Sequence, residues 1–398
     1  MLQEAHPAEE EIGTDLEKHL SRKSTKKDQL PPEKYPLSDL DNNLVGWETQ
    51  DDPANPRNFS NRRKGCILGM VAAITFLSPL ASSIFAPGIP FVNADFNNTS
   101  ALLGSFSVSA YLLGFAVGPL FLSPLSEIYG RCIVLNVSNA FFCAFTLGCA
   151  LAPDLGGLIA MRFLAGVGGS ACLTIGTGVI ADMYIAQQRG KAIAMYSVGI
   201  LFGPILGPII GGFVAQRAGW RWDMWIVLIA GCLLTAALIV FNTETYHPVL
   251  LSRKVAKLRV ELNRPDLQNV MTFNKDAAAK SQFQILKHGI VRPMRMLTTS
   301  LVVLCCSLYV SFLFGLLILL FTTITPVFIQ TYGWSPELTG LAYLGIGLGN
   351  FLGIAIVAKT SDATIIRLAK KNRGVYEPEM RLPLCVFFGM LIPVSLFM

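Results

Sequence analysis

Residues 222–242 read WDMWIVLIAGCLLTAALIVFN, and Asp223 is the only charged residue among them. A helix of about 20 predominantly apolar residues crosses the hydrocarbon core of a bilayer, so this run predicts a membrane-spanning helix. The whole chain follows the same trend. It is 52% hydrophobic and only 15% charged, whereas soluble domains carry about 25% charged residues. The composition therefore predicts an all-α integral membrane protein.

Seven further runs have this length and composition. They are residues 65–88, 101–123, 132–152, 156–182, 191–215, 299–329 and 337–358. A ninth run, 382–398, begins in the same way and reaches Met398 without a flanking polar segment. We therefore expect eight full spans and a partial ninth.

The polar segments divide the chain into four parts. Residues 1–64 mix acidic, basic and proline residues, and we expect a disordered cytoplasmic N-terminal tail. Residues 65–242 form a predicted six-helix N-terminal bundle, 243–298 a basic cytoplasmic central loop, and 299–398 an incomplete C-terminal bundle. Within the loop, 250–262 has apolar residues at helical spacing opposite basic ones, which predicts a helix lying on the membrane surface.

The basic residues predict the orientation of the spans. Alternate inter-helix segments contain 19 Lys and Arg residues in one set and only Arg217 and Arg221 in the other. Cytoplasmic loops carry the excess of Lys and Arg. The basic set and the N-terminus are therefore expected in the cytoplasm.

Several classes of protein do not fit the sequence. The sequence has no basic patch interleaved with aromatic residues, so it does not indicate nucleic-acid binding. The nine cysteines lie in or beside apolar runs, without the Cys and His spacing of a metal site. The four histidines lie in the tail or the central loop, so no catalytic constellation indicates an enzyme, and no cofactor is expected. A nucleotide-binding Gly-x-x-x-x-Gly-Lys motif is also missing.

Several short motifs lie at the ends of the spans and within them. They are GWETQDDPANPRNFS at 46–60, GPLFLSPLSEIYGR at 118–131, RFLAGVGG at 162–169, GILFGPILGPIIGG at 199–212 and EPEMRLP at 377–383. Together they resemble the fungal twelve-span drug:proton antiporters of the major facilitator superfamily, over residues 46–398. The resemblance implies the major facilitator fold, in which two six-helix bundles are joined by a cytoplasmic loop. On that plan the chain is truncated in its ninth helix.

The resemblance assigns a cytoplasmic gate to the loop between the second and third spans. Glu127, Gly130 and Arg131 match a motif that closes this face, partly against an acid for which Asp182 is the match. Cys132 stands where a second basic residue is usual. The alternative is that the two charges of the loop only fix the topology.

Arg162 is a charged residue within a span, away from its ends. An arginine inside the membrane is costly, and a functional role is the first hypothesis. The resemblance implies proton coupling. The alternative is that its side chain extends to the outer interface.

The fifth predicted span carries the motif that marks antiporters in this superfamily. Its members are Gly199, Gly203, Pro204, Gly207, Pro208, Gly211 and Gly212. Glycines four residues apart allow another helix to approach closely. The resemblance implies contact with the second bundle that limits leakage, and purely structural packing is the alternative.

The predicted function is proton-coupled export of small organic compounds (drug, toxin, polyamine or secondary metabolite) across the plasma membrane. Transport would proceed by alternating access. Phe85, Tyr111 and Tyr196 are candidate residues of the substrate cavity. No Asp or Glu lies in the middle of a predicted span, so coupling depends on Arg162 and on the resemblance. The alternative is a truncated remnant of such a transporter that is unable to transport.

Overall fold

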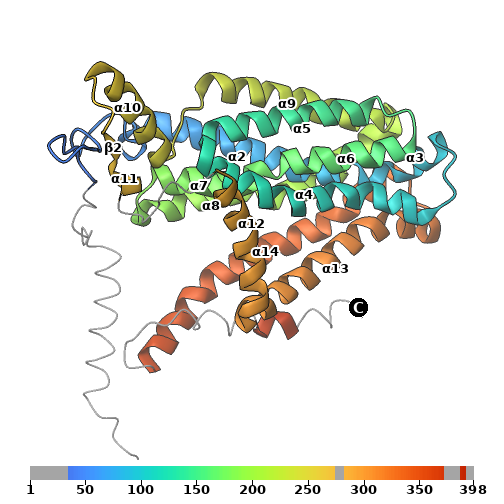
Figure 1. Ribbon diagram of the computed structural model, residues 1–398. Helices are drawn as coiled ribbons and strands as arrows, with labels where there is room; N and C mark the ends of the chain where they lie inside the picture. The colour runs from blue at the N-terminus through green and yellow to red at the C-terminus, as the bar shows by residue number, and fades with distance from the viewer. Residues whose placement is uncertain (1–34, 274–281, 372–385, 391–398) are drawn as a thin grey trace, which may run out of the picture. The chain divides into compact units, whose positions relative to one another are not determined.

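Each of the eight apolar runs up to residue 358 forms helix in the computed structural model. The helices are α2 (Asn61–Ser83), α4 (Ala101–Tyr129), α5 (Arg131–Ala150), α6 (Leu155–Gly169), α7 (Ala171–Met183), α8 (Ala186–Arg217), α9 (Arg221–Phe241), α13 (Leu301–Tyr332) and α14 (Pro336–Lys371) (Figure 1). Among the described residues, seven segments are long and apolar enough to cross a membrane, with α6 and α7 together making one of them. The eighth run lies in α14, which is not among these seven.

The structure describes residues 35–273, 282–371 and 386–390. Residues 35–347 form one compact unit, and the described residues from 348 onward belong to a second unit. Most of the predicted ninth span lies outside the described residues, and its described part, 386–390, is helical.

Polar side chains set where several spans begin. Ser60 accepts a hydrogen bond from the Arg63 backbone at the start of α2. Ser100 accepts one from the Leu103 backbone at the start of α4, and Asp154 accepts one from the Gly157 backbone at the start of α6. Such caps satisfy backbone donors that the first helical turn leaves free. The loops therefore end where the sequence supplies a Ser or Asp before an apolar run.

Short elements gather at the two ends of the long helices. At one end lie η2 (Ala86–Gly88) and α3 (Ile89–Asp95). At the other end lie η1 (Pro56–Asn58), α10 (His247–Glu261), α11 (Val270–Phe273) and two paired strands, β1 (Leu44–Val45) and β2 (Gln268–Asn269). Helix α12 (Gln282–Thr299) connects this end to α13. We call these the α3 end and the α10 end.

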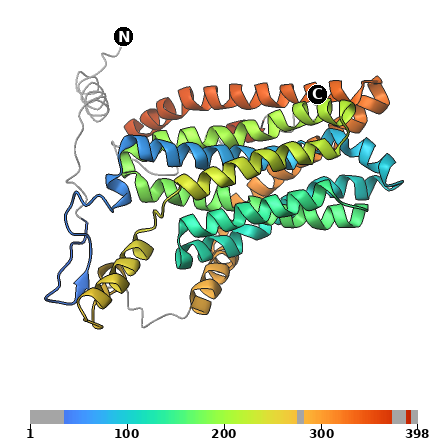
Figure 2. The ribbon, with the colours of Figure 1, turned by 90° about the horizontal axis from the view of Figure 1, so that it is seen from above.

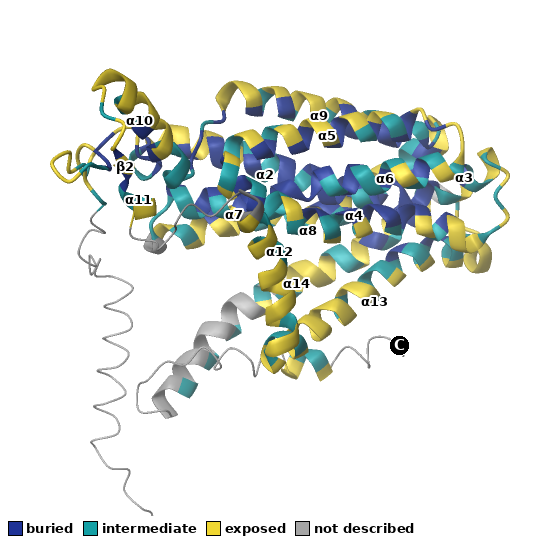
Figure 3. Cartoon of the chain, in the orientation of Figure 1, coloured by how far each residue is buried: buried dark blue, intermediate teal, exposed yellow. Residues whose placement is uncertain are grey.

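The spans before residue 242 pack in pairs. Helix α2 lies against α8, α4 against α6, and α5 against α6 and α9, and Figure 2 shows these helices running alongside one another. Two clusters of buried apolar side chains fill the space between them, one toward each end. Figure 3 shows buried residues between the helices and exposed ones on their outer faces. Outward apolar residues such as Leu233, 68% exposed, suit contact with lipid chains.

The glycines of α8 bring its backbone directly onto α2. A Cβ on Gly199 would lie 2.9 Å from the Ala72 carbonyl oxygen, and one on Gly203 would lie 2.7 Å from that of Phe76. Gly211 meets the carbonyl of Ile84 more closely still. The first contact of this motif is therefore within the N-terminal bundle. Farther along α8, Pro208 faces Gly340 of α14, which also lacks the room for a Cβ.

Part of the predicted disordered tail is folded. Residues 35–60 lie against the central loop through the parallel pairing of β1 with β2. Lys254 Nζ also lies 3.1 Å from Glu48 Oε1. This differs from the prediction because Trp47 becomes buried and the backbone of β1 gains partners that lie more than 200 residues away in sequence. Residues 1–34 lie outside the described residues.

The amphipathic segment 250–262 also differs from expectation. Val255, on its apolar face, is buried in a cluster with Val45 and Leu267, and Leu251 is also buried. The tail and the loop cover this face, so these residues are not available to a membrane surface. The predicted helix is present as α10, but its apolar face packs against other parts of the protein.

We expect Gly211→Ala to lower the thermal unfolding midpoint of the purified protein. The new methyl group would overlap the Ile84 carbonyl and force α2 and α8 apart, which costs about 1–3 kcal/mol. Gly69→Ala on α2 is the control, because no atom lies within 4 Å of its Cβ position. It should leave the midpoint unchanged or raise it slightly. Equal midpoints for both variants would contradict close packing at Gly211.

Candidate functional site

Arg162 lies inside the N-terminal bundle, not at its surface. Its side chain is 1% exposed and is surrounded by α2, α4 and α9. Its Nη2 donates to the Ser82 carbonyl oxygen at 3.1 Å. The guanidinium lies over the ring of Phe85 at 4.4 Å and that of Tyr111 at 5.5 Å. Two aromatic faces and one carbonyl therefore take the place of water around this charge.

Two of the three candidate cavity aromatics belong to this arginine cluster. Phe85 follows α2, and Tyr111 of α4 donates its hydroxyl proton to the Ser78 carbonyl at 3.1 Å. Tyr196 lies apart from them, on α8, and donates to the Cys172 carbonyl of α7 at 2.8 Å. All three side chains are buried. Their role in a substrate cavity stays a prediction.

Asp223 is a second buried charge-bearing residue near Arg162. It stands in the first turn of α9 and is 0% exposed. Neither carboxylate oxygen has a hydrogen-bond partner among the described residues. The sequence predicted no role for this residue. Trp220, a buried aromatic residue three positions earlier, was the signal that this end of α9 is packed.

Arg131 and Asp182, two of the residues proposed from the resemblance, are in contact at the α10 end. Arg131 Nε lies 3.5 Å from Asp182 Oδ2, and the guanidinium lies 4.7 Å from the ring centroid of Tyr246. Gly130 adopts φ +104°, a backbone conformation that favours glycine. Glu127 lies exposed on the preceding helix, outside this ion pair.

Glu244 accepts several backbone hydrogen bonds at the same end, and the sequence predicted no role for it. Its Oε1 accepts hydrogen bonds from the backbone of Arg131 at 2.9 Å and from Thr245 and Tyr246 at 3.0 Å each. It therefore caps α5, whose N-cap, Gly130, has no side chain to do so. A carboxylate at a helix N-terminus is favoured by the unpaired N–H groups there.

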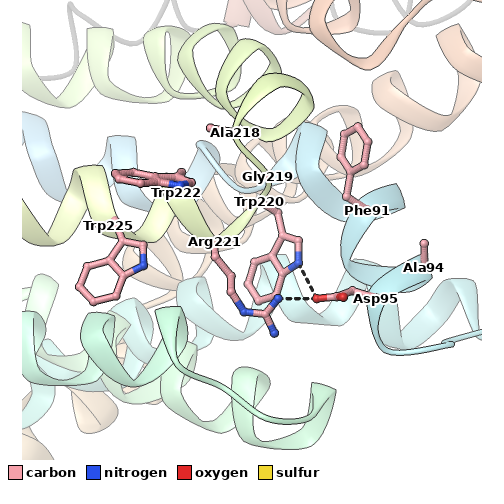
Figure 4. A pocket seen from close by; sticks show the side chains of 9 residues that line it. All are labelled: Phe91, Ala94, Asp95, Ala218, Gly219, Trp220, Arg221, Trp222 and Trp225. Carbon is pink, nitrogen blue, oxygen red and sulfur yellow. Dashed lines mark hydrogen bonds and ion pairs between the residues drawn. The ribbon is translucent and has the colours of Figure 1, made fainter.

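Two cavities open at opposite ends of the bundle. The larger, about 710 Å³, is lined at the α3 end by Phe91, Ala94, Asp95, Ala218, Gly219, Trp220, Arg221, Trp222 and Trp225 (Figure 4). Within it Asp95 accepts hydrogen bonds from Trp220 and Arg221. The smaller, about 390 Å³, includes Arg63, Cys132, Glu244 and Arg253. Tryptophans at the end of the spans fit an aromatic belt at a membrane interface.

The sequence profile of the Major Facilitator Superfamily matches residues 71–398. The chain belongs to the major facilitator superfamily. It is therefore a multi-pass membrane protein and a transporter, and it is not an enzyme.

Curated fungal relatives support this membership. The chain is 43% identical to the MFS-type transporter penM of Penicillium rubens over 358 residues, which cover 90% of this chain and 69% of the relative. It is 40% identical to the efflux pump radE of Floropilus chiversii, covering 90% of this chain and 66% of radE. The chain thus spans about two thirds of the length of these relatives.

Solved structures support the fold. The xylose transporter XylE from E. coli, in a partially occluded inward-open conformation, matches with a TM-score of 0.55 at 17% identity, over 76% of this chain and 72% of that chain. A bacterial homologue of the human lysosomal transporter Spinster, in an inward-facing conformation, matches with a TM-score of 0.56, also at 17% identity. The match covers 77% of this chain and 64% of the homologue. This superfamily member therefore has the major facilitator fold.

Glu244→Ala should lower the free energy of unfolding by about 1 kcal/mol, because four backbone N–H groups lose their acceptor. The thermal unfolding midpoint of the purified protein measures this effect. Glu261→Ala, an exposed carboxylate on α10, is the control and should leave the midpoint nearly unchanged. A midpoint for Glu244→Ala as high as that of the control would contradict the capping role.

The stability of the α10 end should fall at acidic pH through His247. Burial lowers the pKa of this imidazole below its ordinary 6.5. As the pH falls through 6.5, the unfolded chain takes up a proton that the folded protein does not, so the folded state loses stability. The unfolding midpoint should therefore drop further between about pH 7.5 and about pH 5.5 in the wild type than in His247→Gln. Equal drops in the two proteins would contradict this assignment.

Proposed function

We propose that this transporter exports small organic compounds in exchange for protons, by alternating access between its two halves. The exported compound would be a drug, toxin, polyamine or secondary metabolite. The observation that carries the proposal is the burial of Arg162 at the centre of an N-terminal cluster of aromatic side chains. A buried cation of this kind is costly in a membrane, which supports a functional role for Arg162.

Arg162 has the chemistry of a coupling residue. Its charge depends on neighbouring groups for stabilisation, because water does not reach it. Its partners come from three different helices, so a movement of any of them changes its environment. A change in proton occupancy nearby would therefore alter how these helices pack. That link between charge and packing is what coupling needs.

Arg131, Asp182, Glu127 of α4 and Gly130 form the proposed cytoplasmic gate. The 3.5 Å ion pair joins the start of α5 to the end of α7, and Tyr246 covers it. The basic loops and the N-terminus would face the cytoplasm, with the α3 end facing outward across the plasma membrane. The proposed parts are the tail 1–64, the bundle 65–242, the loop 243–298 and the second bundle 299–398.

The helix-5 motif would keep the exporter from leaking. Glycines from Gly199 to Gly211 hold α8 against α2, and Pro208 meets Gly340 of α14. Such dry contacts leave no room for a continuous water path. The proposed direction of transport rests on a relative, since radE is named an efflux pump. Phe85, Tyr111 and Tyr196 are the proposed aromatic residues of the cavity wall.

Efflux of ethidium from host cells expressing the 398-residue chain tests this function. A protonophore should abolish efflux by the wild type. Arg162→Ala should reduce protonophore-sensitive efflux by about tenfold or more, because each tenfold needs only about 1.4 kcal/mol. Arg217→Ala is the control, since this arginine is exposed on α8. Arg162→Lys, which keeps the positive charge, should retain part of the activity.

Two outcomes would contradict the proposal. Wild-type efflux that survives the protonophore would exclude proton coupling. Unchanged, protonophore-sensitive efflux in an Arg162→Ala protein of normal abundance would exclude Arg162 as the coupling residue.

A further inference from the structure

Asp223 is an acidic side chain buried without a bonding partner. It is 0% exposed, and both carboxylate oxygens are without a hydrogen-bond donor in the described part of the chain. Its Oδ2 lies 3.5 Å from the position that a Cβ on Gly88 would occupy, beside Trp220 and Ala215. A buried, ionised carboxylate with no donor is very unstable. Such a site suits a carboxyl group that can hold a proton.

Asp223 has one charged neighbour in the core of the bundle. Arg162 of α6 acts on it electrostatically, and Met224, the next residue of α9, has its sulfur 4.0 Å from Arg162 Nη1. The other titratable groups around the arginine are Tyr111 of α4 and Cys149 of α5, both neutral near physiological pH. On its own helix, Arg221 is paired with Asp95 of α3.

We infer that Asp223 is the proton-carrying carboxyl group that works with Arg162. In this conformation Arg162 interacts with Phe85 and the Ser82 carbonyl, and its Nε has no hydrogen-bond partner among the described residues. This arrangement corresponds to a protonated, neutral Asp223. When Asp223 loses its proton, its negative charge draws the guanidinium toward α9. The exchange rearranges the contacts of α2, α6 and α9, and it rests on the proposed proton-coupled function.

The proton follows a simple balance. A proton from outside water forms an O–H bond with one Asp223 oxygen, and that bond breaks when the proton leaves toward the cytoplasm. The positive charge of Arg162 stays constant throughout. The proposed entry side is the α3 end, where Trp220, Arg221 and Trp222, the residues before Asp223, line the cavity (Figure 4).

A capping role does not explain Asp223. Acidic residues in a first helical turn often accept backbone hydrogen bonds. Here no backbone N–H reaches either oxygen. Asp154 on α6 shows the difference, because its exposed carboxylate accepts from the Gly157 N–H at 3.1 Å. The carboxyl group of Asp223 therefore does not cap the backbone of its own helix among the described residues.

Infrared difference titration of the 398-residue protein in lipid vesicles tests proton binding directly. A carboxylic-acid carbonyl band should titrate in the wild type and be lost in Asp223→Asn, which has nearly the same shape. Asp95→Asn is the matched control, because this acid lies at the same end but is paired with Arg221. It should keep the band. Arg162→Gln should move the titration midpoint of the band by about one pH unit or more.

The outcomes separate this inference from the function on which it rests. Identical titrations of the wild type and Asp223→Asn would overturn the inference, as would an unmoved midpoint in Arg162→Gln. In ethidium efflux, Asp223→Asn should lose protonophore sensitivity, while Asp223→Glu should keep it. Sensitive wild-type efflux that Asp223→Asn leaves intact would overturn only the role of Asp223. Wild-type efflux insensitive to the protonophore would overturn the proposed function instead.

Discussion

The close approach of helix backbones through glycine is the constraint on which this bundle depends. Lipid chains are as apolar as leucine, so helices in a membrane gain little by burying apolar surface and associate through close packing. Gly114 of α4 and Gly166 of α6 each face a backbone carbonyl of the other helix. The glycines of α8 do the same on α2. These two contacts fix where every side chain between the helices can lie.

The packing of α4 on α6 determines the environment of Arg162. Gly166 stands one turn after Arg162, and its contact with the Tyr111 carbonyl holds the aromatic ring beside the guanidinium. The charge is thus enclosed by π faces and one carbonyl instead of water. Such an environment makes the arginine sensitive to any new charge nearby. Met224 contacts Arg162, and Asp223, the residue before Met224, is placed to supply that charge.

The α10 end uses a different device, in which segments distant in sequence complete one another. Glu244, after α9, caps α5, and the Arg131–Asp182 ion pair ties α5 to α7. Residues 35–60 add β1 to β2 and cover the apolar face of α10. The N-terminal segment and the central loop therefore form one folded layer. Any movement of α5 against α7 must disturb this layer as well.

The amino-acid sequence by itself determined the spans, because apolar length alone decides whether a helix can cross a bilayer. It also made Arg162 a candidate for a functional role, since an arginine within an apolar run is conspicuous, and a family resemblance suggested Arg131 and Asp182 as partners in a gate. Only the tertiary structure brought Asp223 beside Arg162, because the two are 61 positions apart and no local pattern relates α6 to α9. It alone gave Glu244 its capping role and ordered residues 35–60, since a polar segment folds only when a distant partner satisfies its backbone.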